Sequence, residues 1–231
     1  MKKFSIVFAL VMLLTSAGRA LAHKPIFVEA MSNVARENAA KISAPTISWA
    51  IYGQLSQIGE VNYYTFEGAR SARVKIDVSV PRIDSERDFG VAVALIGTGL
   101  PENAAGAFLA LNAGEGAIIA PDLLRDPSRI FNEPFTQTSY WTRQTLAAQL
   151  PNDGTYTLAV WNPRGQTGKY VLAIGEREEF GIADLLDFPR TWVKVHSFFR
   201  GTGADFENAF VVLFLGSAVL IAGRTIERRF R

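Results

Sequence analysis

The sequence of 231 residues contains no cysteine, and this absence removes several classes of protein at once. Without thiols there can be no disulfide framework, thiolate metal site, cysteine nucleophile or lipid-modified N-terminal cysteine. The sequence also has only two histidines, and its 24 Lys and Arg nearly balance its 22 Asp and Glu. Because nucleic-acid binding usually requires a basic excess, we expect no nucleic-acid partner.

Motifs of common enzymes are also missing. The sequence has no His-Glu-x-x-His, no Gly-x-Ser-x-Gly, no phosphate-binding Gly-Lys-Ser/Thr loop and no EF-hand spacing. A Ser-His-Asp triad would depend on His23 or His196, and each lies in a terminal part of the chain that is a poor place for a rigid base. The acidic clusters at 84–88 and 176–179 are typical of solvated turns. We therefore predict that the protein is not an enzyme.

The N-terminus has the three parts of a secretory signal peptide. A basic start is followed by the apolar run Phe4–Leu14, and then by Ala20 and Ala22 at the small-residue positions before a cut. The pattern predicts a signal peptide over residues 1–22. The mature chain would then begin at His23.

The C-terminus carries a second apolar block over residues 209–223, followed by four arginines. With its flanking residues this block predicts a single transmembrane helix over 205–226 and a cytoplasmic tail over 227–231, because arginines mark the cytoplasmic side. A buried core helix and a removable sorting tail remain alternatives. The prediction is a single-pass protein of a bacterial cell membrane, with its N-terminal domain outside the cytoplasm and the bilayer as one partner.

The exported part is dominated by alternation of apolar and polar residues, which is typical of strands buried on one face. Glycine and proline turns separate the segments, and 91–96 is an unbroken apolar run that predicts a strand buried on both faces. Eight strands are expected: 47–52, 63–66, 74–80, 91–96, 117–119, 142–150, 154–160 and 168–174. The fold class is therefore mainly β, an antiparallel, jelly-roll-like β-sandwich over 47–179, preceded by an extended segment over 23–46.

Two parts of this pattern resemble a known family. The segment Gly59–Phe66 and the paired Gly-x-Tyr-x-Leu strands that begin at Gly154 and Gly168 are similar to the start and end of bacterial pre-peptidase C-terminal-type β-sandwich domains. The resemblance covers about residues 47–176. It implies a non-catalytic accessory module of secreted proteins, and it supplies no active site. Where many such domains carry aspartate this chain has Asn62, which argues against cation binding at that turn.

The segment 180–204 changes to a helical period. Its apolar positions recur at intervals of three and four residues, at Leu185, Phe188, Trp192, Val195 and Phe199. An aromatic amphipathic segment just outside a transmembrane helix suits the membrane interface or a membrane-protein partner. The alternative is that this face packs back on the sandwich.

The predicted first residue, His23, suggests a metal site. Its terminal amine and imidazole could together chelate copper, as nitrogen donors suit Cu(II). This arrangement resembles the start of histidine-brace copper proteins, which need a further imidazole. Only His196 could supply it.

Aromatic residues suggest a third possibility, carbohydrate binding. Strand parity directs Tyr63 and Trp161 away from the core, and Tyr140 and Trp141 lie in or beside a loop, so sugar rings could stack on them. The irregular stretches at 97–116 and 121–138 are further candidate binding loops.

Together these observations predict a non-catalytic binding or accessory subunit of an envelope or membrane protein complex. The partner would be a membrane or envelope protein, and no cofactor is required. Copper binding at His23 and carbohydrate binding are the alternatives.

Overall fold

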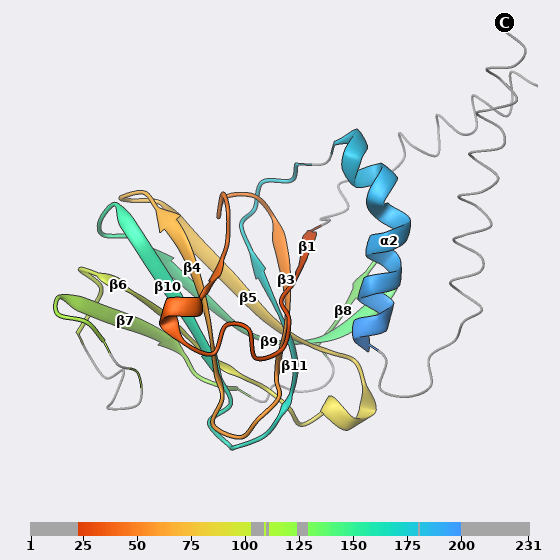
Figure 1. Ribbon diagram of the computed structural model, residues 1–231, viewed down its shortest axis with the longest axis horizontal. Coiled ribbons are helices and arrows are strands. Elements are labelled where there is room, and N and C mark those ends of the chain that lie inside the picture. Colours follow the sequence, from red (N-terminus) through yellow and green to blue (C-terminus); the bar gives the residue numbers. More distant parts are fainter. Residues whose placement is uncertain (1–22, 103–108, 110, 124–128, 180, 200–231) are drawn as a thin grey trace, which may run out of the picture.

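A computed structural model describes residues 23–102, 109, 111–123, 129–179 and 181–199, except the side chains of residues 182 and 185. Two sheets pack face to face, and helix α2 (Ile182–Phe199) lies against one of them (Figure 1). The predicted signal peptide, transmembrane helix and tail fall outside the described residues. Among the residues that are described, no helix has the length and apolar character needed to cross a bilayer.

The first sheet has six strands in the order β1-β3-β11-β5-β9-β8. Their bounds are β1 Lys24–Phe27, β3 Trp49–Leu55, β11 Gly168–Ile174, β5 Arg73–Pro81, β9 Thr138–Gln149 and β8 Ile130–Glu133. The second sheet has five strands in the order β2-β4-β10-β6-β7. Their bounds are β2 Ala40–Lys41, β4 Val61–Gly68, β10 Gly154–Trp161, β6 Ala92–Thr98 and β7 Glu115–Ala120.

The mainly β sandwich predicted from the alternation is confirmed, with two differences. The stretch 23–46 is part of the sandwich, because β1 and β2 each form an edge strand. Both pair in parallel, β1 with β3 and β2 with β4, whereas the remaining pairs are antiparallel. The candidate loop 121–138 contains β8, and the candidate loop 97–116 takes in the end of β6 and the start of β7.

The main core lies between the sheets and is sealed. Tyr156 and Leu158 from β10 meet Tyr170 and Leu172 from β11 there, each at most 1% exposed, as the strand parity predicts. The hydroxyls of Tyr64 and Tyr170 lie 2.7 Å apart, so these two buried polar atoms are paired. Gly53 makes room for them, since a Cβ atom there would lie 2.6 Å from both hydroxyl oxygens.

Strand β6 is buried on both faces, as the unbroken apolar run predicts. Val93 and Leu95 face the main core, whereas Ala94 and Ile96 join a second cluster on the outer face of the five-stranded sheet. Leu109 is also buried in this second cluster, which explains why that face of β6 is apolar.

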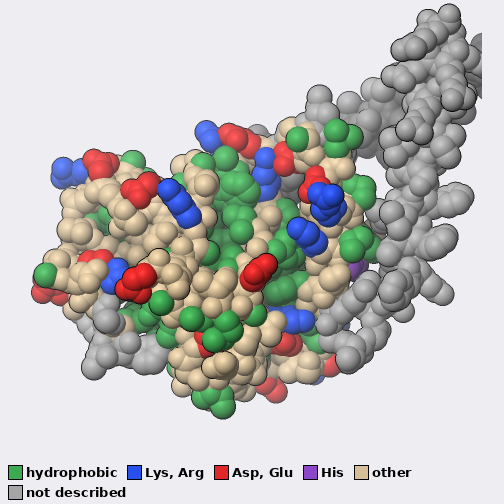
Figure 2. Space-filling model, in the orientation of Figure 1, with side chains coloured by type: hydrophobic (Ala, Val, Ile, Leu, Met, Phe, Trp, Pro, Cys, Tyr) green, Lys and Arg blue, Asp and Glu red, His purple; other side chains and the backbone are tan. Residues whose placement is uncertain are grey.

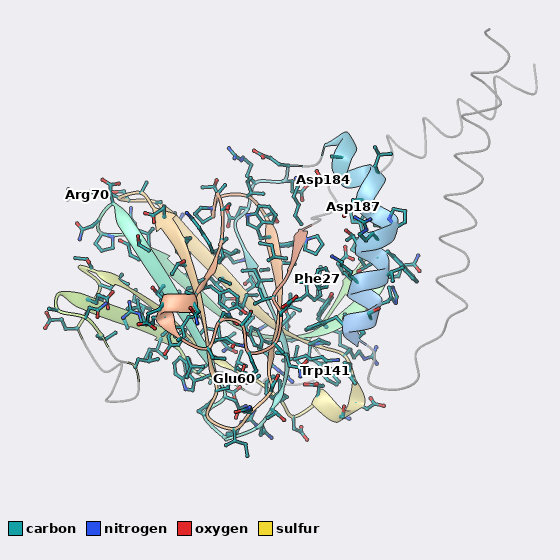
Figure 3. The ribbon with its side chains drawn as sticks, in the orientation of Figure 1. Phe27, Glu60, Arg70, Trp141, Asp184 and Asp187 are labelled. Carbon is teal, nitrogen blue, oxygen red and sulfur yellow. The ribbon has the colours of Figure 1, made fainter. Side chains whose placement is uncertain are left out.

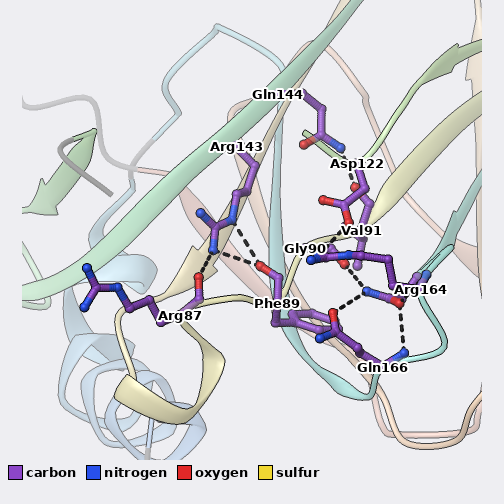
Figure 4. A network of polar contacts seen from close by, with 10 residues as sticks. Arg87, Phe89, Gly90, Val91, Asp122, Arg143, Gln144, Arg164 and Gln166 are labelled. Atoms are coloured by element: carbon purple, nitrogen blue, oxygen red, sulfur yellow. Dashed lines mark hydrogen bonds and ion pairs between the residues drawn. The ribbon is translucent and has the colours of Figure 1, made fainter. Parts of the chain in front are cut away.

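Strand β9 is longer than predicted and contains a bulge. Its pairing with β5 shifts register between Asp77 and Ser79, so that Arg143 and Gln144 together oppose one residue. Both side chains are buried and turn toward the chain between β5 and β6 (Figure 4). Arg143 donates to the carbonyl oxygens of Phe89 at 2.8 Å and Arg87 at 2.7 Å. The bulge therefore places two polar side chains where alternation would place one.

Candidate functional site: a cleft between helix α2 and the six-stranded sheet

Helix α2 packs on the outer face of the six-stranded sheet, which corrects the expectation that its apolar side faces a membrane. Trp192 is 3% exposed and Val195 1% exposed. Val195 contacts a cluster that includes Tyr52 from β3 and Tyr140 from β9. The alternative interpretation of the helical period, packing back on the sandwich, is the one that the structure shows.

The floor under this helix is formed by two rows of residues that strand register brings side by side. One row crosses five strands through Pro25, Ala50, Ala173, Asp77 and Thr145. The parallel row runs through Phe27, Tyr52, Val171, Ser79 and Thr142. The first row holds two alanines at its centre, and the second holds an aromatic pair at one end. The first row therefore leaves space above its small side chains, whereas large side chains fill part of the space above the second row.

A cleft of about 600 Å³ lies between this floor and the helix. Its roof comes from one side of α2, from Asp184 and Asp187 through Phe188 and Thr191 to Val195. Figure 3 shows Asp184 and Asp187 on the first turns of the helix, with Phe27 between the sheet and the helix. A space of this size is within the usual range for small-molecule sites.

Most charged side chains in the cleft wall are already engaged within the chain. Asp77 accepts a hydrogen bond from the Thr145 hydroxyl at 2.6 Å and forms an ion pair with Lys75 at 2.8 Å. Glu133 accepts the backbone N–H groups of Phe135 and Thr136 at 3.0 and 2.6 Å. These contacts leave the apolar floor as the main feature offered to a ligand.

The phenols of Tyr52 and Tyr140 form a buried pair in the same wall, with their oxygens 2.9 Å apart. Thr138 also donates to the Tyr140 oxygen at 3.1 Å. Burial raises the pKa of Tyr140 to about 12, and the pKa of Tyr52 is raised well above its ordinary value for the same reason. Both phenols are therefore neutral at physiological pH.

Four residues predicted from the sequence for different reasons line this one cleft: His23, Phe188, Val195 and Tyr140. Phe199 stacks edge-on against Tyr140 with ring centroids 5.1 Å apart, so it also packs inward. Leu185 lies in α2, but its side chain is outside the described part.

The second imidazole that a histidine brace would require is engaged elsewhere. Nε2 of His196 lies 2.7 Å from the carbonyl oxygen of Thr136, and its ring stacks on Trp192 with centroids 3.7 Å apart. In the described portion of the chain, no three His, Cys, Asp or Glu side chains group in a way that could hold a metal ion. Copper binding at His23 stays a prediction, without a ligand set around it.

The four aromatics proposed for carbohydrate binding are not together. Tyr140 and Trp141 are buried, at 3% and 4% exposure, on opposite faces of β9, which corrects the expectation that they lie at a loop. Tyr63 and Trp161 point away from the main core as parity predicts, but both are half-buried against the second cluster. Two of the four aromatic side chains are therefore inaccessible to a sugar.

Sequence reasoning did not find the floor residues Ala50, Val171, Ala173 and Ser79, or the ion pair between Lys24 and Asp184. Alanine and serine at outward strand positions carry no signal of their own. They become a floor only when β3, β11 and β5 are adjacent, and these strands are far apart in the sequence.

Comparisons with known proteins give no family. No family model matches the chain, and no curated protein matches its sequence. Among solved structures, the chain is similar to the pre-peptidase C-terminal domain of a Bacillus anthracis collagenase, with 18% identity, a TM-score of 0.32, and coverage of 59% of this chain and 93% of that one. It is also similar to Aeromonas hydrophila PliG, a periplasmic inhibitor of g-type lysozyme, with 14% identity, a TM-score of 0.30, and coverage of 67% and 98%.

A third similar structure is the copper-binding secreted protein MopE of Methylococcus capsulatus. Here the identity is 10%, the TM-score 0.30, and the coverage 68% of this chain and 100% of that one. Likenesses at this level do not carry an assignment of family, ligand or location. The β-sandwich is established by the two sheets themselves.

Proposed function

We propose that this protein is an extracytoplasmic binding module, tethered to the membrane by its C-terminal segment, and that its site is the cleft under α2. The sandwich acts without catalysis, as an accessory subunit of an envelope or membrane complex. The observation that carries the proposal is the alanine floor of a cleft of about 600 Å³, in which most charged side chains of the wall are already engaged.

The ligand that fits these walls is a small, uncharged and largely apolar molecule. At most of the charged groups in the wall, such as Asp77 and Glu133, a charged ligand would have to compete with existing ion pairs and hydrogen bonds. An apolar ligand only has to displace water from the floor, which releases about 25 cal/mol per Å² of apolar surface removed from water. The neutral phenols of Tyr52 and Tyr140 add polar contacts without adding charge.

Filling the floor tests this site. We would titrate the uncharged fluorophore 1-aminoanthracene into the full-length protein in detergent and compare it with the Ala173→Leu variant. The variant should lose saturable binding by at least about tenfold, because the leucine side chain occupies the floor. Ala69→Leu, at an exposed position, makes the same change elsewhere and should bind as the unchanged protein does. Equal signals from all three would refute the cleft as the site.

The location is tested separately from the cleft. The intact mass of protein extracted from membranes should correspond to loss of the first 22 residues, and extraction should require detergent rather than alkaline carbonate. A reporter that works only outside the cytoplasm should be silent when fused after Arg231. Retention of the leader would contradict both this location and a metal site built on a terminal His23.

A further inference from the structure

Strand β8 forms one edge of the six-stranded sheet, and its outer side pairs with no strand among the described residues (Figure 1). Its pairing with β9 shows which of its backbone groups face outward. Thr142 donates its N–H to the carbonyl oxygen of Arg129 at 3.0 Å, and Ile130 lies opposite Trp141. In an antiparallel pair, hydrogen-bonded and non-hydrogen-bonded positions alternate. Ile130 and Asn132 therefore direct their N–H and C=O groups away from β9.

The other three edges of the sandwich are protected against strand pairing in ways that β8 is not. β1 carries Pro25, β2 has only two residues, and in β7 the N–H of Ala117 donates to the carbonyl oxygen of Pro101 at 2.9 Å. Prolines, short strands and covering segments are common ways in which a sheet edge avoids partners. β8 contains no proline and no lysine, and it presents Ile130 and Phe131, each 38% exposed, on opposite faces. Its edge is therefore suited to accept another strand.

A second copy of β8 fits this edge in a register that the outward groups define. Antiparallel pairing of Ile130 with Asn132 of the second copy uses the outward N–H and C=O groups of both residues. The same register places Phe131 opposite its own counterpart, and Arg129 opposite Glu133 on each side of the two-fold axis. Opposite charges at facing strand positions stabilise a pair. Within the described chain Arg129 forms no ion pair, so the second copy supplies the carboxylate that it lacks.

We propose that two copies of this chain associate through antiparallel pairing of their β8 strands, which joins their six-stranded sheets into one continuous sheet. This inference goes beyond the cleft and its ligand. Arg129, Phe131 and Glu133 also line the cleft, so the second copy extends the cleft wall. The contact is small, and interfaces of this size are typically weak and transient.

The symmetry of this pairing agrees with the proposed attachment to a membrane. The two-fold axis of an antiparallel strand pair is perpendicular to the joined sheet, so the α2 helices of both copies lie on the same face. Near the end of α2, Nε2 of His196 lies 2.7 Å from the carbonyl oxygen of Thr136, three residues after β8. The ends of both helices therefore lie near the joint and on one face. Attachment to one bilayer would raise the local concentration of this weak interface, but the pairing does not depend on it.

The chain contains no cysteine, so one introduced thiol can report this pairing through a disulfide between copies. Phe131→Cys places two thiols at a non-hydrogen-bonded position, where Cα atoms about 4.5 Å apart permit a disulfide. We would follow the disulfide-linked dimer of the full-length protein in mild detergent after adding diamide. It should form at least about tenfold faster than in Ile58→Cys, because random collisions alone bring the thiols at that position together. Residue 58 is 77% exposed and lies outside the edge.

Two substitutions in the Phe131→Cys background test how the copies meet. Ile130→Pro removes an outward N–H but no hydrogen bond to β9, and it should slow the disulfide at least about fivefold. Ile130→Val keeps this N–H and should leave the rate unchanged. Arg129→Glu sets like charges opposite each other and should slow the disulfide about three- to tenfold. Arg70→Glu is its matched control, because Arg70 is exposed and lies on the side of the molecule away from β8 and α2 (Figure 3).

Three results would overturn this pairing. Equal rates at positions 131 and 58 would mean that the second copy does not bind at this edge. Unchanged rates in Ile130→Pro and Arg129→Glu would mean that the thiols meet without strand pairing. A different protein that co-purifies in a fixed ratio and protects the thiol at position 131 would mean that another partner occupies the edge. Because the assay uses no ligand, failure of the cleft to bind 1-aminoanthracene would refute the proposed function and leave this pairing intact.

Discussion

Two apolar layers flank the six-stranded sheet, one against the second sheet and one against α2, and they are filled to different degrees. Between the sheets, residues such as Ile51, Leu158 and Leu172 are completely buried. Under α2, burial is complete at Val195, but the space over Ala50 and Ala173 stays open as part of the cleft. The sealed layer supports the fold, and the partly filled layer leaves a site.

The cause of the difference is geometric. Two sheets present extended surfaces whose side chains interdigitate along their whole length. A helix is a cylinder, and among its described side chains the fully buried apolar ones lie beyond Pro189, where Val195 meets large partners such as Tyr52 and Tyr140. Between the alanines and the described side chains of the helix, such as Phe188, the cleft stays open. A protein can thus keep a cleft without weakening its main core.

The largest expected effect is on the sealed layer. Leu158→Ala or Leu172→Ala should lower the free energy of unfolding by about 2–5 kcal/mol, because each leaves a cavity in a packed core. Urea unfolding of the full chain in detergent, followed by near-ultraviolet circular dichroism, measures this. Thr155→Ala, at an exposed position of the same strand, is the matched control and should change stability by no more than about 0.5 kcal/mol. Thr157 is unsuitable, because it is itself only 5% exposed.

A smaller effect is expected in the helix layer. Val195→Ala removes two buried carbon atoms and should cost about 1–2 kcal/mol. Hydrogen exchange should accelerate more at the amides of α2 than at those of β10, because the helix can detach while the sandwich stays folded. Equal acceleration in both elements would mean that the two layers unfold as one unit. The layers would then differ in how tightly they are packed but not in when they unfold.

The pH dependence of stability reports on the layer under α2 through Tyr140. The pKa of Tyr140 is raised to about 12 by burial, whereas the unfolded chain titrates near 10. Its contribution is therefore fully present below pH 10 and is lost as the pH rises toward 12, because the unfolded state releases its proton first. Tyr140→Phe should give a shallower fall in the urea midpoint over this range. Parallel curves for the two proteins above pH 10 would contradict the burial of this phenol.

The smallest effect is expected on the outer surface of α2. Figure 2 shows hydrophobic side chains there interspersed with basic and acidic ones, and Leu186 is 74% exposed. Leu186→Gln should therefore change the free energy of unfolding by no more than about 0.5 kcal/mol. A clearly larger loss would indicate that this surface is covered in the full chain, by the bilayer or by a membrane partner.

Much of the sandwich could be predicted from local pattern. Alternation identified the inward faces of β5, β10 and β11, and the unbroken run identified β6 as buried on both faces. This works because successive side chains of a strand point to opposite faces of the sheet, so neighbouring residues report the environment of each face. The edge strands β1 and β2 were missed because each is four residues or shorter and pairs with a partner that follows it in the chain. Too few residues are present in such strands for a period to be visible.

The candidate site was less predictable. His23 was predicted to bind copper, Phe188 and Val195 to contact the membrane or a membrane partner, and Tyr140 to contact carbohydrate. Nothing in the spacing of these four residues indicated that they line one cleft. Trp141 was placed in or beside a loop because the predicted strand begins at residue 142, whereas β9 begins at Thr138. The bulge at Arg143 and Gln144, inside that strand, was also missed. A bulge is defined by the pairing of one strand with its neighbour. The residues of the bulged strand alone therefore do not predict it.

The sequence by itself determined the class of fold, the inward face of the long strands and the amphipathic character of α2, since each follows from the order of apolar and polar residues along a few turns or strand lengths. The tertiary structure alone decided which surface the apolar side of α2 covers, because an apolar stripe specifies burial and does not specify a partner. It also decided that Ala50, Ala173 and Asp77 adjoin, since register between strands distant in the chain is set by their pairing in the complete sheet.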